Sequence, residues 1–288
     1  MKKRISTGIM IMIFVIGLSL LLYPGVSNFW NSIHQTYAIV DYEASLEGLS
    51  PTDYTVYWEA AEDYNRELAG LEEPLKNYDQ IDGYKALLNV RNNGMMGYIT
   101  IPDLNVELPI YHGTSESVLS KAAGHLEGSS LPVGGENTHC VISAHRGLPS
   151  AKLFTNLDQV EVGDSFSMKI LDRTLAYEVF EISVVKPDEI EKLGIEAGKD
   201  LCTLVTCTPY GINSHRLLVH GKRTEAALER EVQPMIETGA GLERAIQPMI
   251  ETEEEVLPPN REIAAGIALV ILAVLVYVFW KRKRKRKT

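Results

Sequence analysis

Two long uncharged runs, one towards each end of the chain, constrain its fold more than any other feature. The first extends from Ile5 to Tyr23 and the second from Ile263 to Trp280. An α-helix rises about 1.5 Å per residue, so a run of about twenty apolar residues crosses a hydrocarbon core roughly 30 Å thick. Both runs are therefore predicted to form transmembrane helices, which leaves the chain between them to fold in water.

Basic residues flank both runs on the side that faces the chain terminus. A KKR triplet (2–4) precedes the first run, and a KRKRKRK tail (281–287) follows the second. Because basic flanks stay in the cytoplasm, we expect both termini inside the cell and the segment from about 26 to 261 outside it. A cleaved signal peptide, with a weak site at 25–27, is the alternative for the first run, but the long apolar core favours an uncleaved anchor.

The net charge of −10 conceals a more acidic exported segment. Ten of the 28 basic residues lie in the two terminal tails, so 18 remain against 38 acidic residues. A nucleic-acid-binding surface would be basic, so the composition argues against that class of protein. An acidic surface instead suits a soluble domain outside the cell.

Two amphipathic helices are predicted next to the membrane. Apolar and aromatic residues recur at helical spacing from Asn28 to Leu46. An SPTD stretch (50–53) then supplies an N-cap, a proline at the first helical position and an acidic third residue, for a helix that ends near Gly70. The polar, proline-containing stretch after it (71–83) is predicted to form a loop before a short helix around Tyr84 to Val90.

After Gly94 the sequence changes to short β-rich runs separated by Gly, Pro, Asn and Asp. This spacing predicts a closed or nearly closed β-barrel rather than a parallel α/β sheet. The barrel is expected between about Met95 and Arg223, which is long enough for one hydrophobic core. The runs are MMGYITI, VELPIYHG, HCVISAH, SFSMKIL, LAYEVFEISVV, LCTLVTC and RLLVHGKR.

A tandem repeat separates the predicted barrel from the second apolar run. LEREVQPMIETGAG (228–241) is followed by LERAIQPMIET (242–252). Two copies are too few for a solenoid, so this acidic, proline-punctuated segment is predicted to be a tether.

The chain holds three cysteines, an odd number in a compartment that permits disulfides, so at least one thiol is expected to stay unpaired. Cys202 and Cys207 are five residues apart in one predicted strand, which places their side chains on opposite faces. They are therefore poorly placed to pair with each other or to bind one metal ion. Cys140 is expected to pack as a small hydrophobic residue, whereas Cys207 is either a packed residue or a nucleophile.

A cysteine nucleophile needs a neighbour that favours its thiolate and a donor for the oxyanion that forms when it attacks a carbonyl. His145 ends one of the predicted strands, where its side chain can reach a neighbouring strand. Arg216 starts the strand that follows the TPYGINSH loop, so a short connection can return it beside Cys207. The three residues are therefore expected to share one groove.

These stretches closely resemble the signatures of class C sortases, the pilin-polymerising transpeptidases of Gram-positive bacteria. The resemblance is carried by TLVTCTPYGINSHRLLVHGKR (203–223) and by AHRGLPSAKLFTNLD (144–158). A third stretch, GYITIPDLNVELPIYHGTSESVLSKAAGHLEGSSLPVGG (97–135), extends it over nearly all of residues 84–223.

The resemblance implies an eight-stranded sortase-type barrel and a cysteine transpeptidase. It implies that Cys207 attacks the Thr carbonyl of a Leu-Pro-x-Thr-Gly-type sorting signal and forms a thioacyl enzyme. His145 protonates the leaving glycine amine and deprotonates the incoming pilin lysine amine, while Arg216 stabilises the oxyanion and the bound peptide. This chemistry requires no metal and no cofactor, and its partners are pilin subunits, with a pilin lysine or a peptidoglycan amine as acceptor.

Class C sortases also carry a lid, an N-terminal loop whose Asp-Pro-aromatic motif covers the active site. The corresponding position here holds Glu73-Pro74-Leu75. The Glu73 carboxylate is one methylene longer and is still expected to reach Arg216, and Pro74 should bias Glu73 towards an extended, strand-like plug. Leu75 lacks the aromatic ring, which predicts a lid that opens more readily, and an ordinary surface loop is the alternative.

Three other functions remain open at this level. A sortase that anchors surface proteins to peptidoglycan would use a cell-wall amine in place of the pilin lysine. A thiol hydrolase would lose the acyl group to water, and a membrane-tethered binding module would keep Cys207 as a structural residue. The lid-like segment and the second apolar run favour polymerisation.

The predicted fold is mainly β, an eight-stranded barrel with N-terminal helices and a lid-like loop, flanked by two transmembrane helices. The predicted parts are an N-terminal anchor or signal (1–25), membrane-proximal helices (26–70), the lid (71–83), the catalytic barrel (84–223), the tether (224–262), a transmembrane helix (263–280) and a basic cytoplasmic tail (281–288).

Overall fold

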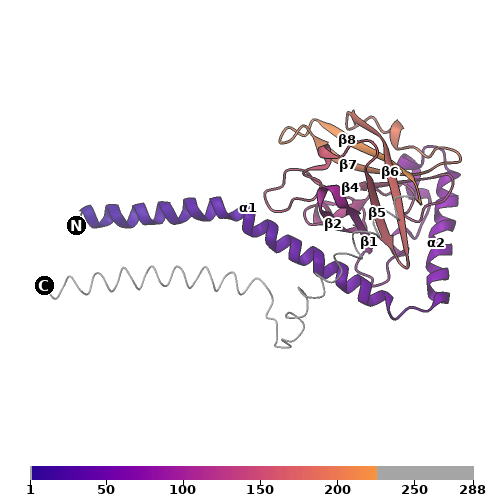
Figure 1. Ribbon diagram of the computed structural model, residues 1–288, viewed down its shortest axis with the longest axis horizontal. Helices are drawn as coiled ribbons and strands as arrows, with labels where there is room; N and C mark the ends of the chain where they lie inside the picture. Colours follow the sequence, from indigo (N-terminus) through magenta and orange to yellow (C-terminus); the bar gives the residue numbers. More distant parts are fainter. Residues whose placement is uncertain (1, 226–288) are drawn as a thin grey trace. The chain divides into compact units, whose positions relative to one another are not determined.

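A computed structural model describes residues 2–225. Most of the predicted tether, from residue 226 onwards, the second apolar run and the basic tail lie outside the described residues. Within them the chain forms two long helices, an irregular connection and a closed barrel of eight strands (Figure 1).

The first helix, α1, extends without a break from Lys2 to Leu46. It joins the first apolar run to the amphipathic segment predicted after it, with Pro24 inside the helix, so the expected boundary near residue 25 is not a break in the backbone. The stretch Met12–Leu46 is long and apolar enough to cross a membrane. The end of α1 packs on the barrel through Tyr42, whose hydroxyl donates to the Met96 carbonyl at 2.9 Å.

The second helix, α2, covers Pro51–Ala69, as its sequence predicts. The Ser50 hydroxyl accepts from the Asp53 backbone N–H and the Asp53 carboxylate accepts from the Ser50 backbone N–H, which completes a capping box. Trp58 and Leu68 are buried on the inner face of α2, and the Trp58 indole N–H donates to Asp172 at 2.7 Å.

The connection from α2 to the barrel is built of short turns: α3 (Pro74–Asn77), η1 (Tyr78–Gln80) and η2 (Tyr84–Ala86). The prediction of a short helix from Tyr84 to Val90 is therefore wrong in extent, because only a single 3-10 turn forms. Leu88 has φ +55, a left-handed conformation that a right-handed helix does not admit. The Tyr84 hydroxyl is buried against the Nδ1 atom of His125 at 2.9 Å, which anchors this end of the connection.

The barrel closes in the order β1-β2-β3-β4-β7-β8-β6-β5, which confirms the predicted eight-stranded fold. All neighbouring strands are antiparallel except the pairs β2–β3 and β4–β7, which are parallel. The strands are β1 (Met95–Ile101), β2 (Val106–His112), β3 (Ala123–His125), β4 (Thr138–Ser143), β5 (Ser165–Ile170), β6 (Arg173–Val185), β7 (Asp200–Thr208) and β8 (His215–Arg223). Short helical turns interrupt the connections at η3 (Pro102–Leu104), α4 (Glu116–Leu119), η4 (Leu157–Gln159) and η5 (Glu191–Leu193).

Side chains alternate between two apolar clusters along the central strands, as the period of two in a β-strand requires. Cys202 and Leu204 of β7 point into the main core inside the barrel. Val205 of the same strand belongs to a separate, smaller cluster that also contains Val141 of β4 and Leu218 of β8. The three strands therefore bury apolar surface on both faces, and the smaller cluster marks the outer face on which a site can be built.

A buried network of hydrogen-bonded polar side chains lies on this outer face, beside the smaller cluster. The Thr203 hydroxyl lies 2.7 Å from Nε2 of His139 and 2.8 Å from Nδ1 of His220, and Nδ1 of His139 donates to the Gly194 carbonyl at 2.8 Å. Burial lowers the pKa of both histidines, and the pKa of His220 falls to about 4, with the neighbouring His139 as a further cause. Both rings are therefore neutral in the folded protein at neutral pH.

We expect the barrel to lose stability as the pH falls from about 6.5 towards 4. An unfolded His220 binds a proton near pH 6.5, whereas the folded ring does so only near pH 4, so the stabilisation is complete above 6.5 and is lost below it. Asn cannot titrate, so in His220→Asn the free energy of unfolding should fall by about 1 to 3 kcal/mol less between pH 6.5 and pH 4 than in the wild type. Urea unfolding between pH 4 and 8 measures this loss. The partly exposed His215→Asn variant serves as control, and an unchanged pH dependence in His220→Asn would contradict the argument.

Candidate active site

The parallel pairing of β4 with β7 brings His145 beside Cys207. The register pairs Thr138 with Asp200 and Ser143 with Val205, an offset that is constant along the two strands. The backbone N–H of Ala144 still donates to the Val205 carbonyl at 3.1 Å, so the pairing continues beyond the end of β4. The same offset places His145 level with Cys207.

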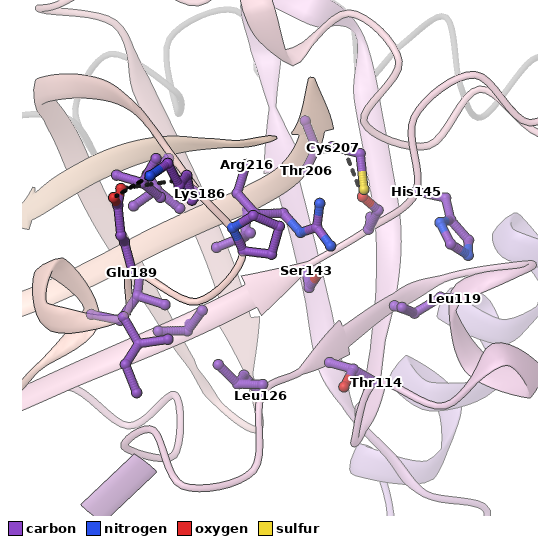
Figure 2. Close-up of a pocket in the computed structure, with 18 residues that line it drawn as sticks. Thr114, Leu119, Leu126, Ser143, His145, Lys186, Glu189, Thr206, Cys207 and Arg216 are labelled. Atoms are coloured by element: carbon purple, nitrogen blue, oxygen red, sulfur yellow. Dashed lines mark hydrogen bonds and ion pairs between the residues drawn. The ribbon is translucent and has the colours of Figure 1, made fainter. Parts of the chain in front are cut away.

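Antiparallel pairing of β7 with β8 places Arg216 on the other side of the thiol. Cys207 and Arg216 are direct register partners across a tight loop. His145, Cys207 and Arg216 therefore occupy one row of the outer face, one residue from each of three neighbouring strands or their extensions. In the view of Figure 2 the thiol lies between the imidazole ring and the guanidinium group.

Loop carbonyls orient the guanidinium group of Arg216. Its Nη1 atom donates to the carbonyls of Asn213, at 3.3 Å, and of His215, at 3.1 Å. These bonds occupy one nitrogen of a group with five N–H donors, so others stay free to bind an oxyanion or a peptide carbonyl.

The three residues line a groove of about 340 Å³ on the outer face. Its wall below them is apolar, formed by the smaller cluster and by the connection from β6 to β7. Figure 2 shows His145, Cys207 and Arg216 towards one end and Lys186 and Glu189 at the other. The apolar lining residues are Leu119, Leu126, Val141, Ala144, Val185, Pro187, Ile190, Leu193, Val205 and Leu218.

Two neighbours of the site were not predicted from the sequence. The carboxylate of Glu116, at the start of α4, lies 3.3 Å from Nε2 of His145. The hydroxyl of Thr206 donates to the Ala144 carbonyl at 2.8 Å and ties the His145 loop to β7. Both contacts join residues far apart in the chain, so no local sequence pattern predicts the role of Glu116. Thr206 could have been found from the sequence, because it is adjacent to Cys207.

The site has the parts of a thiol acyl-transfer centre. The Cys207 thiol is partly exposed at the groove, whereas Cys140 and Cys202 are free and buried. An imidazole such as that of His145 can give and accept a proton, and the Arg216 guanidinium is a cation beside the thiol. Within residues 2–225 no three His, Cys, Asp or Glu side chains gather as ligands of a metal ion would.

The lid segment 71–83 lies near the groove but not in the expected conformation. Glu73 has φ +50, and its carbonyl accepts from the backbone N–H groups of Lys76 and Asn77, so Pro74 begins a helical turn. The expectation of an extended plug is therefore wrong, because Pro74 is well suited to the first position of a helix. The Glu73 carboxylate pairs with the Lys76 ammonium at 2.7 Å, while Leu75 packs against the smaller outer cluster.

Comparison with known proteins gives one consistent family. A family model described as a sortase domain matches residues 99–224. Sortase C1 from Streptococcus agalactiae, a solved structure, is 45% identical, with a TM-score of 0.60 over 65% of this chain and 98% of its own. A solved structure of Clostridium perfringens sortase C with the C-terminal cell wall sorting motif is 43% identical, with a TM-score of 0.58 over 66% of this chain and 99% of its own.

Curated relatives match over shorter spans. Sortase D of Bacillus subtilis is 30% identical over 142 residues, which is 48% of this chain and 69% of the relative. Sortase A of Streptococcus agalactiae is 33% identical over 134 residues, 46% of this chain, so the match spans only 53% of that relative's length.

We expect a small thiol reagent to modify the folded protein at Cys207 alone. Only this thiol reaches the groove, whereas Cys140 and Cys202 are 2% and 0% exposed. Intact-mass measurement should show one adduct on the wild type and on the Cys140→Ala and Cys202→Ala variants, and none on Cys207→Ala. Denatured wild type should carry three adducts, and rapid modification of folded Cys207→Ala would overturn the assignment.

Proposed function

The chain belongs to the sortase family of cysteine transpeptidases, and we propose that it is a class C sortase. In this proposal it cleaves a Leu-Pro-x-Thr-Gly-type signal between Thr and Gly and transfers the acyl group to a pilin lysine amine. The observation that carries the proposal is the row of His145, Cys207 and Arg216 at the end of an apolar groove. The identity of 42% to 45% with several solved sortase C structures supports the class.

The reaction proceeds in two halves through the same thiol. The Cys207 thiolate attacks the Thr carbonyl carbon, and the charge that develops on the oxygen is stabilised by the Arg216 guanidinium. The C–N bond to glycine breaks as His145 gives a proton to the leaving amine, which yields a thioester. The lysine amine then attacks this thioester, His145 accepts its proton, and the C–S bond breaks to return the thiolate.

The groove suits the apolar half of a sorting signal. Its lining below the thiol is formed largely by aliphatic side chains, among them Val205 and Leu218, which can bury a leucine and a proline. His145, Cys207 and Arg216 lie together towards one end, where the scissile bond must lie. This division between an apolar wall and a reactive end supports a peptide substrate over a small polar one.

The proposal places the barrel outside the cell, held at the membrane by the first apolar helix. The stretch Met12–Leu46 has the length and composition of a membrane anchor. The KKR triplet (2–4) before it favours a cytoplasmic N-terminus. A barrel held near the membrane surface meets substrates that are themselves exported and anchored there.

A peptide that carries the sorting signal, incubated with and without a lysine-containing acceptor peptide, tests this function. Mass spectrometry should show an amide-linked product with the acceptor present, and Cys207→Ala should form neither product nor thioacyl enzyme. Arg216→Lys should lose about 10²-fold in kcat/KM, because an ammonium is a point charge that misplaces the oxyanion donor. Transfer to a peptidoglycan amine in preference to lysine would indicate wall anchoring, and hydrolysis alone would indicate a thiol hydrolase.

We also propose that the segment 71–83 acts as a lid on the groove. Leu75 packs on the same cluster that forms the groove wall. Gly128 makes room for this docking: a Cβ there would lie 2.7 Å from the Tyr78 ring and 3.1 Å from the Pro74 carbonyl oxygen. The lid is thus held by apolar contact, while Glu73 is paired within its own turn.

Leu75→Ala should open the lid. A substrate binds only the open fraction, and losing about 1 kcal/mol of apolar contact should lower the KM for the sorting peptide by up to about fivefold. Leu75→Trp, with more apolar area to bury, should raise KM. Steady-state kinetics measures both, with Ile81→Ala as control, since Ile81 lies in the same connection but packs on the main core. Equal KM values in all four proteins would show that the segment is not a lid.

A further inference from the structure

A buried arginine directly follows His145 and contacts the residue that directly follows Cys207. The side chain of Arg146 is only 8% exposed. Its Nη2 atom forms an ion pair with the Asp158 carboxylate, and its Nη1 atom lies 3.4 Å from the Thr208 hydroxyl. A buried guanidinium is costly unless it is paired and fixed in place, and these partners fix Arg146 in place.

The contact with Thr208 begins where the backbone pairing of β4 and β7 ends. The last backbone hydrogen bond between these two segments runs from the Ala144 N–H to the Val205 carbonyl. The register that places His145 level with Cys207 also places Arg146 level with Thr208. The side chain of Arg146 therefore continues the link between the two chain segments past the level of the thiol.

Arg146 also contacts the loop that follows Cys207. Its Cζ atom lies 5.8 Å from the centre of the Tyr210 ring. The same ring covers Gly147, where a Cβ would lie only 3.0 Å from the Tyr210 Cε2 atom and where φ is +75. This loop also supplies the Asn213 carbonyl that helps to orient Arg216, so the contacts of Arg146 reach the surroundings of all three site residues.

Asp158, the other partner of Arg146, lies in a segment that packs on the main core. The backbone N–H of Phe154 donates to the His145 carbonyl at 3.1 Å, and Phe154 itself is fully buried in the main core. Asp158 follows in the turn η4, next to the buried Leu157. The carboxylate that holds Arg146 therefore belongs to a packed turn rather than to a free loop.

We propose that Arg146 is a positioning residue that holds His145 in reach of Cys207. It acts as a clamp between Asp158 on the His145 loop and Thr208 and Tyr210 after the thiol. The proposal rests on the proposed roles of His145 and Cys207, because proton transfer in both half-reactions requires the imidazole at a defined distance. A displacement of about 1 Å in such a group costs about 10²-fold in rate.

Arg146→Lys and Thr208→Val test the clamp by steady-state transfer to a lysine peptide. Arg146→Lys keeps a charge for Asp158 but loses the planar fork, so kcat should fall about 10- to 100-fold while KM stays within about twofold. Thr208→Val removes only the acceptor of Nη1 and should lower kcat by a smaller factor. The double variant should be no worse than Arg146→Lys, because both changes break one contact.

Arg173→Lys is the matched control. Arg173 also lies over an aromatic ring, that of Trp58 at 4.2 Å, and pairs with a carboxylate, that of Glu62 at 4.0 Å, but it faces α2. Its kcat should equal that of the wild type, and thermal unfolding establishes that each variant is folded. If Arg146→Lys fails to fold, the kcat of Thr208→Val alone tests the proposal.

Three results would overturn the proposal. The first is a wild-type kcat in folded Arg146→Lys or Thr208→Val, and the second is a multiplication of the losses from the two changes in the double variant. A rise in KM without loss of kcat would assign Arg146 to substrate binding and would equally overturn it. Failure of the proposed function is distinguishable, because the wild type itself would then form no transfer product.

Discussion

The parallel hydrogen-bonded pairing of β4 with β7 is the constraint on which the site depends. Its register decides that His145 and Cys207 lie side by side, because a shift by one residue would send one of the two side chains to the opposite face. The antiparallel partner β8 adds Arg216 to the same row. Three residues separated by 62 and by 9 positions in the chain, as the register pairs show, thus meet without any of them having to leave a strand or its immediate extension.

The two faces of these strands have separate tasks. The inner face carries the main core, in which Cys202 lies fully buried. The outer face carries the smaller cluster around Val205, which forms the groove wall and also receives Leu75 from the connection after α2. The proposed lid therefore packs on the same apolar cluster that forms the groove wall, through a leucine in place of an aromatic residue.

Local signals in the sequence predicted local structure well. The SPTD stretch (50–53) specified the start of α2 because its capping contacts join residues three apart, and the period of two correctly placed Cys202 and Cys207 on opposite faces. The predictions failed where the backbone takes left-handed values. Glu73 turns into α3 instead of extending. The 3-10 turn that begins at Tyr84 ends at Ala86, and Leu88 then takes a left-handed conformation. Neither glutamate nor leucine is a residue type from which a left-handed conformation would be predicted.

The sequence by itself determined the class of fold, the long apolar N-terminal helix and the three residues of the proposed catalytic row, because these follow from hydrophobic period, run length and a family signature. Only the tertiary structure decided what surrounds them. Glu116 reaches His145, and Arg146 joins Asp158 to Thr208, through contacts between segments that are 12 to 62 positions apart in the chain. Such contacts depend on strand register and loop packing, which are properties of the whole barrel and leave no mark in a local stretch of sequence.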